Sequence, residues 1–284
     1  MIITHNACIY RRKEAKIEAS KKGRDHMLRY FESIIESLRG QENPMVDQTQ
    51  GVFYLFSKEE GVVSGLDEIQ TLLNLYDIDI EFRKHKQNGQ SVKRGEILCS
   101  ITGEKDSIYR ILNTLTYIVG KMMGLSSLVR LYQSKLQQAS VIDLYDISTS
   151  DLSLSKKAMK DGGAIALDLF KLDEILIDVL GNRVLAIEKA KSIQSKPVMI
   201  EISDIQQFYE IEHTDVDFVC LKYLNDEAIR RIILDNRGKK RLILAGLLLP
   251  QRLDIIGTYQ FDYLYTSLFH QASRVYDIGV KVGI

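Results

Sequence analysis

The stretch that decides the fold is residues 88–124, NGQSVKRGEILCSITGEKDSIYRILNTLTYIVGKMMG. Its first half alternates apolar and polar residues between glycines, which is typical of short strands joined by turns. From Ser107 onward the apolar residues recur at helical spacing. The sequence therefore predicts a strand over 95–103, followed by two or more helices that reach to about Gln138.

Within this stretch Gly89, Val92, Gly95 and Leu98 form the spacing GxxVxxGxxL, which resembles the turn of biotin- and lipoyl-carrier domains. A carrier also presents a lysine on an exposed hairpin, and no such hairpin pattern precedes this stretch. The sequence that follows is helical, whereas a carrier continues as strands. The spacing therefore indicates a strand and turn inside a larger domain.

Strands and helices alternate through the rest of the chain. An amphipathic helix is predicted over 13–38, a strand over 51–57, a helix over 66–76 and a strand over 78–86. After residue 140, short apolar runs recur with helical segments between most of them, which predicts βαβ units and a parallel sheet. Six such runs favour an α/β barrel: SVIDLYDIS, EILID, PVMIEIS, DFVCLKYL, RLILAGLLL and FDYLYTS.

The composition limits the partners of the chain. Its 284 residues carry 38 Lys and Arg against 38 Asp and Glu, so the formal net charge is zero. This balance gives no general attraction to nucleic acid or to an anionic membrane. The apolar run at 242–251 is about half the length of a membrane-spanning helix. Three cysteines without a CxxC pair and the lack of a signal-peptide pattern favour a cytoplasmic location.

Eight segments share the order and spacing of motifs in one family: EEGVVSGLDEIQTLLNLY, NGQSVKRGEILCSITG, LNTLTYIVGKMMGLSS, KKAMKDGGAIAL, DEILID, PVMIEIS, DFVCLKYL and SLFHQASRVYDIGVKV. Together they resemble the quinolinate phosphoribosyltransferases, which are the carboxylating nicotinate-nucleotide pyrophosphorylases. The resemblance runs from about Met27 to the last residue. It rests on the order of all eight segments, because none of them is decisive alone.

This resemblance implies the fold and the assembly. The expected fold is α/β, with an N-terminal open α/β sandwich domain and an incomplete α/β barrel of the type II phosphoribosyltransferase kind. The first domain is expected over 1–118, completed by a strand within 271–284, and the barrel over 119–270. The family also implies a homo-oligomer, first of all a dimer, in which the neighbour's N-terminal domain closes each barrel.

The family's reaction joins a pyridine dicarboxylate to phosphoribosyl pyrophosphate, releases carbon dioxide and uses magnesium. Such a pocket needs cations that hold carboxylates and phosphates. At the matching positions this chain has lost most of them, while the family's glutamate is kept as Glu201. The replacements are Tyr145 and Asp146 for an Arg-Lys pair, Leu167 and Asp168 for His-Arg, Asp178 for a lysine, and Lys222 with Tyr223 for Asp-Asn.

The phosphate-binding turns of the family are also reduced. The Ser-Gly-Gly turn corresponds here to Ala245, Gly246 and Leu247, and the second turn falls near Thr266 and Ser267. A glycine-rich turn binds phosphate through its backbone N–H groups, so these losses weaken an anion site.

Two interpretations of the remaining residues stay open. The carboxylates at 146, 168, 178 and 201 are expected at the ends of barrel strands, where such folds place their chemistry. They could form a cation site, with Glu201 and Asp178 as ligands of a metal such as magnesium. Alternatively the mouth is vestigial, with Lys222 neutralising one aspartate. Tyr145 and Tyr223 could stack on a planar ligand or fill an emptied pocket.

These changes predict a diverged phosphoribosyltransferase-like protein, a pseudoenzyme that has lost the ancestral reaction of NAD biosynthesis. The alternative is an active pentosyltransferase of the nicotinate-nucleotide pyrophosphorylase class with an altered substrate or metal dependence. The sequence assigns no catalytic residue, no certain cofactor and no particular small-molecule ligand.

Overall fold

The structure, a computed structural model, describes residues 26–38, 49–77, 79–143, 150–165, 175–176, 182–193, 197–271 and 274–283. The chain divides into two compact units. The first contains Met1–Ser126, Ile147–Asp161 and Arg274–Ile284, and the second contains Ser127–Asp146 and Gly162–Ser273. Segments of the two units alternate along the chain, so both are built from discontinuous sequence.

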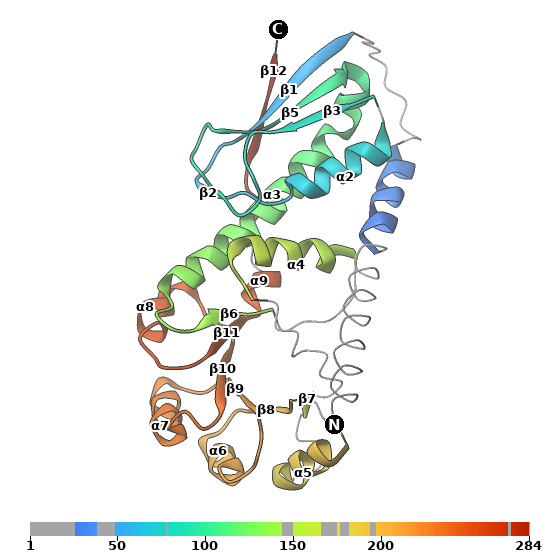
Figure 1. Ribbon diagram of the computed structural model, residues 1–284. Coiled ribbons are helices and arrows are strands. Elements are labelled where there is room, and N and C mark those ends of the chain that lie inside the picture. Colours follow the sequence, from blue (N-terminus) through green and yellow to red (C-terminus); the bar gives the residue numbers. More distant parts are fainter. Residues whose placement is uncertain are drawn as a thin grey trace, which may run out of the picture. The chain divides into compact units, whose positions relative to one another are not determined.

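The first unit is built on an antiparallel sheet with the strand order β12-β1-β5-β3 (Figure 1). On its buried face Phe53 and Leu55 lie opposite Ile101 and Cys99, because alternate residues of a strand share a face. The ring of Tyr109 meets Phe53 edge-on, so α3 packs on this face. The elements of the unit are β1 (Gln50–Ser57), β2 (Gly61–Val62), α2 (Leu66–Tyr76), β3 (Glu81–Lys84), β4 (Ser91–Val92), β5 (Ile97–Glu104), the first part of α3 (Lys105–Lys135), most of α4 (Ser150–Gly162), and β12 (Ile278–Gly283).

The expectations for this half of the chain can be compared with these elements. The strand predicted over 51–57 and the helix predicted over 66–76 are confirmed by β1 and α2. The helix predicted over 13–38 is present over 26–38, where Phe31 and Ile35 are buried. Residues 13–25 lie outside the described part.

Two glycines within residues 88–124 have a backbone conformation that other residues rarely adopt. Gly89 and Gly95 have φ angles of 84° and 88°, in the left-handed region that costs glycine little. Between them β4 pairs with β2, and after Gly95 the chain enters β5. The spacing GxxVxxGxxL is therefore two turns around a short strand, inside a sheet domain and not a carrier.

The two or more helices predicted after this strand are one continuous helix, so that prediction is wrong. The helix α3 has 31 residues and runs through Gly120 and Gly124. A Cβ at Gly124 would lie 1.8 Å from the carbonyl oxygen of Arg274, and one at Gly120 would lie 2.3 Å from that of Tyr276. These glycines do not break the helix; they allow the backbone at 274–276 to pass against it.

The second unit is built on a parallel sheet with the strand order β6-β11-β10-β9-β8-β7 (Figure 1). Its strands fall within the six predicted apolar runs, and helices connect most of them. This architecture confirms the incomplete α/β barrel. The elements are β6 (Ser140–Val141), β7 (Ile175–Leu176), α5 (Arg183–Ile193), β8 (Met199–Ile202), α6 (Ile205–Ile211), β9 (Phe218–Lys222), α7 (Asp226–Asn236), β10 (Arg241–Gly246), the 3-10 helix η2 (Pro250–Arg252), α8 (Leu253–Ile256), β11 (Tyr263–Thr266) and α9 (Leu268–Gln271).

One face of the parallel sheet holds the core of the second unit. Buried side chains from β8, β9, β10 and β11 contact one another there and form a single apolar cluster. The cluster consists of Ile142, Met199, Phe218, Cys220, Ile243, Ala245 and Tyr265. Because alternate residues of a strand share a face, the next residues toward the carboxyl ends of β8 and β9 on this face are Glu201 and Lys222.

Among the described residues, no helix combines the length and the apolar character that crossing a membrane requires.

Candidate functional site

The described part of the barrel mouth brings together three of the predicted residues. Glu201 lies near the end of β8, Lys222 ends β9, and Tyr223 follows it. The predicted Gly246, Thr266 and Ser267 lie at the ends of β10 and β11 or directly after them. Tyr145, Asp146, Asp168 and Asp178 lie outside the described residues, so the acidic cluster predicted from them stays a prediction.

Glu201 and Lys222 form an ion pair directly above the apolar core. The Nζ of Lys222 lies 3.0 Å from Oε1 of Glu201, and both side chains are about one-third exposed. Burial lowers the pKa of Lys222, but the hydrogen bond to Glu201 and its charge outweigh burial and hold this pKa above its usual value. Lys222 is therefore a firmly charged ammonium, and its charge is matched by Glu201.

The thiol of Cys220, which lies on the same strand as Lys222, is chemically inert. Cys220 lies two residues before Lys222 on the same face of β9, and burial raises the pKa of its thiol to about 12. A thiolate is the reactive form of cysteine, and it is absent at neutral pH under these conditions. The mouth therefore has no cysteine nucleophile at this position.

Tyr223 holds an unusual position at the rim of the mouth. Its φ angle is 60°, in the left-handed region that a bulky residue rarely adopts. Its side chain is 77% exposed, and the Lys222 ammonium lies 5.5 Å from the centre of its ring. The turn after β9 therefore directs a large aromatic ring into solvent instead of the core.

The residues predicted as remnants of phosphate-binding turns form hydrogen bonds within their own backbone. The Leu248 N–H donates to the Gly246 carbonyl at 3.1 Å and to the Thr266 hydroxyl at 3.3 Å. The Ser267 N–H donates to the same Gly246 carbonyl at 3.4 Å, and the Leu268 N–H donates to the Thr266 hydroxyl at 3.3 Å. The N–H groups of Leu248, Ser267 and Leu268 are thus engaged within the protein.

The described residues of the mouth do not fit a magnesium ion. Magnesium prefers carboxylate oxygens and water in an octahedral shell. Glu201, the predicted ligand within the described part, is already held by the Lys222 ammonium, which would repel a divalent cation. Within the described residues, no group of three or more His, Cys, Asp or Glu side chains is placed to hold a metal.

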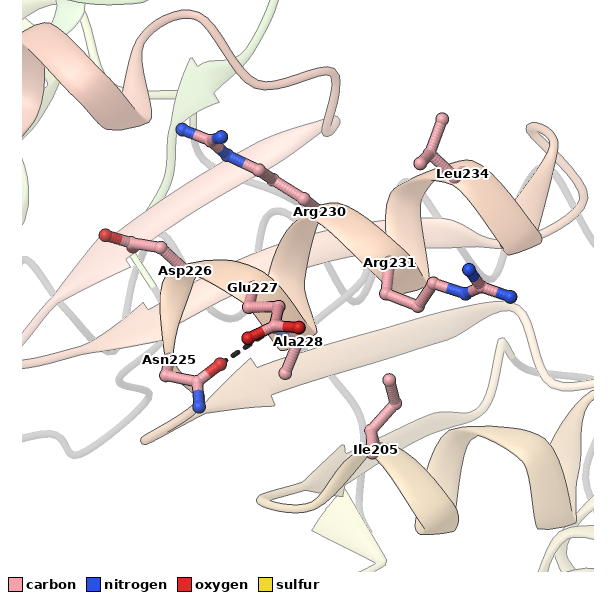
Figure 2. Close-up of a pocket in the computed structure, with 8 residues that line it drawn as sticks. All are labelled: Ile205, Asn225, Asp226, Glu227, Ala228, Arg230, Arg231 and Leu234. Carbon is pink, nitrogen blue, oxygen red and sulfur yellow. Dashed lines mark hydrogen bonds between the residues drawn. The ribbon is translucent and has the colours of Figure 1, made fainter.

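A pocket of about 630 Å³ is lined by Ile205 of α6, by Asn225 and by residues of α7. Figure 2 shows Ile205 of α6 below the first turns of α7, with Arg230 and Arg231 on its walls. Three of its four charged lining residues have partners: Arg231 pairs with Asp235 at 3.0 Å, Asp226 pairs with Arg252, and Arg230 lies over the ring of Tyr259.

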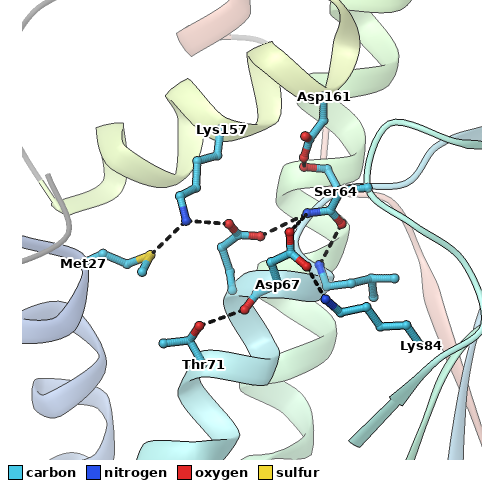
Figure 3. Close-up of polar contacts among 10 residues, drawn as sticks. Met27, Ser64, Asp67, Thr71, Lys84, Lys157 and Asp161 are labelled. Carbon is cyan, nitrogen blue, oxygen red and sulfur yellow. Dashed lines mark hydrogen bonds and ion pairs between the residues drawn. The ribbon is translucent and has the colours of Figure 1, made fainter. Parts of the chain in front are cut away.

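A second polar cluster lies in the first unit, where α4 meets the start of α2 (Figure 3). The carboxylate of Glu68 is only 2% exposed and lies 2.8 Å from Nζ of Lys157. The Ser64 hydroxyl donates to Asp161 at 2.6 Å. Lys84 pairs with Asp67 beside them. Three carboxylates thus converge around two ammonium groups.

Asp161 is the residue of this cluster whose ionised form the surroundings disfavour. Burial, followed by the charges of Glu68 and Asp67, raises its pKa to about 6, while the Ser64 hydrogen bond and Lys160 act the other way. Sequence reasoning missed this cluster, because Glu68 and Asp161 are far apart along the chain and no motif links them.

Replacing Asp161 with asparagine is expected to stabilise the protein at neutral pH. Because the folded state raises the pKa, the unfolded chain binds fewer protons between about pH 4 and pH 6, so ionised Asp161 costs stability above pH 6. The free energy of unfolding is expected to rise by about 1 kcal/mol, since water screens this partly exposed carboxylate.

Melting temperatures at pH 7.5 and pH 4.5 test this expectation, with the exposed Asp79→Asn as the control. The gain at Asp161 should shrink at the lower pH, where the native carboxyl is already protonated. A gain of equal size at both values, or a loss at pH 7.5, contradicts the assignment.

Comparison with known proteins agrees with this architecture. Residues 30–122 match the family model for the N-terminal domain of quinolinate phosphoribosyl transferase. A probable nicotinate-nucleotide pyrophosphorylase (carboxylating) of Methanothermobacter thermautotrophicus is 22% identical over 254 residues, covering 82% of this chain and 89% of that protein. A protein with the same description from Synechocystis is 20% identical over 247 residues, covering 83% and 84%.

Solved structures share the fold. The nicotinate-nucleotide pyrophosphorylase of Ehrlichia chaffeensis has a TM-score of 0.80 at 19% identity, covering 89% of this chain and 98% of its own. That of Francisella tularensis has a TM-score of 0.76 at 19% identity, covering 91% and 96%. An open α/β sandwich unit together with an incomplete α/β barrel defines a type II phosphoribosyltransferase fold. Residues 30–122 thus match the N-terminal domain of the quinolinate phosphoribosyltransferase family, and over most of its length the chain is similar to members of that family at low identity.

Proposed function

We propose that this protein no longer forms nicotinate mononucleotide from quinolinate and phosphoribosyl pyrophosphate. The observation that carries the proposal is the Glu201–Lys222 ion pair at the top of the barrel core. A dicarboxylate needs cations that are not already neutralised, and here the ammonium of the described mouth is matched by a carboxylate of the protein.

The replaced cations would each have contributed to the binding free energy of the anionic substrates. A charge contact at about 4 Å is worth about 4 kcal/mol at an effective dielectric constant of 20. Several cations of the family are replaced in this sequence, and Asp146, Asp168 and Asp178 add negative charge at matching positions. The internal hydrogen bonds of the turns at Gly246 and Thr266 lower the affinity for pyrophosphate further.

In an assay with quinolinate, phosphoribosyl pyrophosphate and magnesium, the purified protein is expected to form no nicotinate mononucleotide above background. The physical reason is that both substrates are polyanions and the site has lost the charges that bind them. The relative from Methanothermobacter thermautotrophicus, assayed in parallel, is the control. Turnover by this protein that disappears in a Glu201→Ala variant would falsify the proposal.

A second candidate function is a ligand-binding protein or transferase of the same family with a different substrate. The observation that favours it is Tyr223, whose strained backbone presents an exposed ring at the mouth. A purely vestigial mouth has no need of such a residue. The homo-oligomer and the cytoplasmic location expected from the sequence stay predictions.

A further inference from the structure

We propose that the outer face of the antiparallel sheet in the first unit binds single-stranded nucleic acid. Tyr54 is the stacking surface for a base, and Lys281 and Arg83 are the contacts for phosphates. The inference goes beyond the proposed function, because it concerns a surface of the first unit and not the barrel mouth.

The outer face of this sheet carries side chains that stay partly exposed. Along β1, Phe53 and Leu55 of the inner face are completely buried, because α3 packs there. The residues that alternate with them, Val52, Tyr54 and Phe56, are partly exposed. Two of these three side chains are aromatic, so the outer face offers aromatic surface to a partner.

Two glycines of β12 allow these aromatic rings to lean across the sheet. A Cβ at Gly279, which pairs with Phe56, would lie 2.2 Å from the Phe56 ring. A Cβ at Gly283 would lie 3.1 Å from the Tyr54 ring. Both rings therefore pack against the backbone of β12, and Tyr54 remains partly exposed in this position.

A row of side chains across the four strands has a cation at each end. Lys281 of β12 pairs with Tyr54, and its ammonium lies 5.2 Å from the centre of the Phe56 ring. This cation–π contact helps to position the ammonium beside Tyr54. On the other side of Tyr54, Ser100 of β5 pairs with Arg83 of β3. The row therefore consists of a cation, an aromatic ring, a hydroxyl and a second cation.

The two cations of this row keep an unmatched charge. Lys84, on the inner face of β3, pairs with Asp67. Within the described ranges Lys281 and Arg83 have no such ion pair, and Glu81 of the same face lies in the next row of the sheet. Three strand spacings separate the two cations by about 14 Å. Two separate, unmatched cations favour an extended anion with several charges.

Charge also argues against a second copy of the chain on this face. A two-fold axis along the strands would place β12 of one copy over β3 of the other, and therefore Lys281 over Arg83. Like charges that face each other across an interface weaken it. An acidic peptide matches the cations but offers no regular series of flat rings to Tyr54. A single strand supplies phosphates and stacking bases together.

The test is fluorescence anisotropy with labelled oligothymidylate and oligouridylate, with a duplex of equal length and polyglutamate as comparison probes. The net charge of the chain is zero, so the attraction is local and the expected dissociation constant is about 10–100 µM at 50 mM salt. Two phosphate contacts should weaken binding about sevenfold between 50 and 200 mM salt. The duplex should bind more weakly, because its bases are not available to stack on the protein.

Variants of the row locate the site. Tyr54→Thr removes the ring but keeps a residue that favours strands, so the affinity should fall about tenfold, whereas Tyr54→Phe should bind as the wild type does. Lys281→Gln, at an exposed edge position, should weaken binding and halve the dependence on salt. This variant also tests the site if Tyr54→Thr does not fold. The exposed Lys189→Gln in the second unit changes the net charge equally and is the control.

Several results would overturn the inference. They are no binding of either single strand, a duplex bound as tightly as a single strand, or unchanged binding in Lys281→Gln and Tyr54→Thr. Polyglutamate bound more tightly than the single strands would assign the face to an acidic peptide instead. A molecular mass that falls in Tyr54→Thr, with no oligonucleotide binding to the wild type, would assign it to a contact between copies of the chain.

Discussion

Replacing Gly124 with alanine is expected to destabilise the first unit by about 3 kcal/mol or more, because the new Cβ has no space. It would lie 1.8 Å from the carbonyl oxygen of Arg274 and 3.0 Å from its carbonyl carbon, and backbone atoms cannot rotate away as a flexible side chain can. Alanine raises helix propensity over glycine by about 1 kcal/mol, so the steric term has to exceed this gain.

The clash should weaken the attachment of β12, the strand that follows Arg274, to β1. The segment is held by the Tyr276 N–H donating to the Gly120 carbonyl at 2.9 Å, by ion pairs of Arg274 with Glu59 and of Asp277 with Lys58, and by the pairing of β12 with β1. Urea denaturation should show the loss, and hydrogen exchange should show faster exchange in β12 and β1. Thr116→Ala, elsewhere on α3, is the control. A Gly124→Ala protein as stable as the wild type would refute the close approach.

Replacing Lys157 with methionine is expected to have the second large effect, a loss of about 3 kcal/mol. The change removes the ammonium from Glu68, whose side chain is 2% exposed and lies 2.8 Å from it. The amide of Asn88 is the remaining described donor to Glu68, at 3.4 Å. A buried carboxylate that keeps one long hydrogen bond lowers the free energy of unfolding by much more than the intact ion pair raises it.

A double-mutant cycle separates this penalty from the loss of packing. Lys157→Met combined with Glu68→Gln leaves no charge behind and should recover most of the stability, as measured by urea denaturation at pH 7.5. The exposed Lys189→Met, in the second unit, is the control. If the double variant is no more stable than Lys157→Met alone, the buried charge is not the cause.

Local sequence patterns were sufficient for most elements of the fold. The helix over 66–76 and the strand over 51–57 were predicted from periodicity, because each carries its own apolar face. The helix α3 was divided wrongly, since Gly120 and Gly124 resemble breaks when their distant neighbours are unknown. Only the backbone at 274–276 explains why glycine is needed there.

The candidate site was predictable in part. Glu201 and Lys222 were placed at the barrel mouth by their positions at strand ends, but their pairing depends on the register of β8 against β9. The left-handed backbone of Tyr223 has no sequence signal, because residues other than glycine rarely adopt it. The Glu68–Lys157 contact joins segments whose sequences carry no sign of each other.

The pairing of β1 with β12 has a consequence for biosynthesis. Lys58 and Asp277, which bond to each other beside this pair of strands, are 219 residues apart. A ribosome that adds about 5–20 residues per second needs roughly 10–40 seconds to make the intervening chain. During this time one edge of β1 has no neighbour, and an open strand edge invites pairing with other nascent chains. The strands β1, β3 and β5 emerge well before the strand that completes their sheet, so the edge of β1 has to be shielded until β12 has been synthesised.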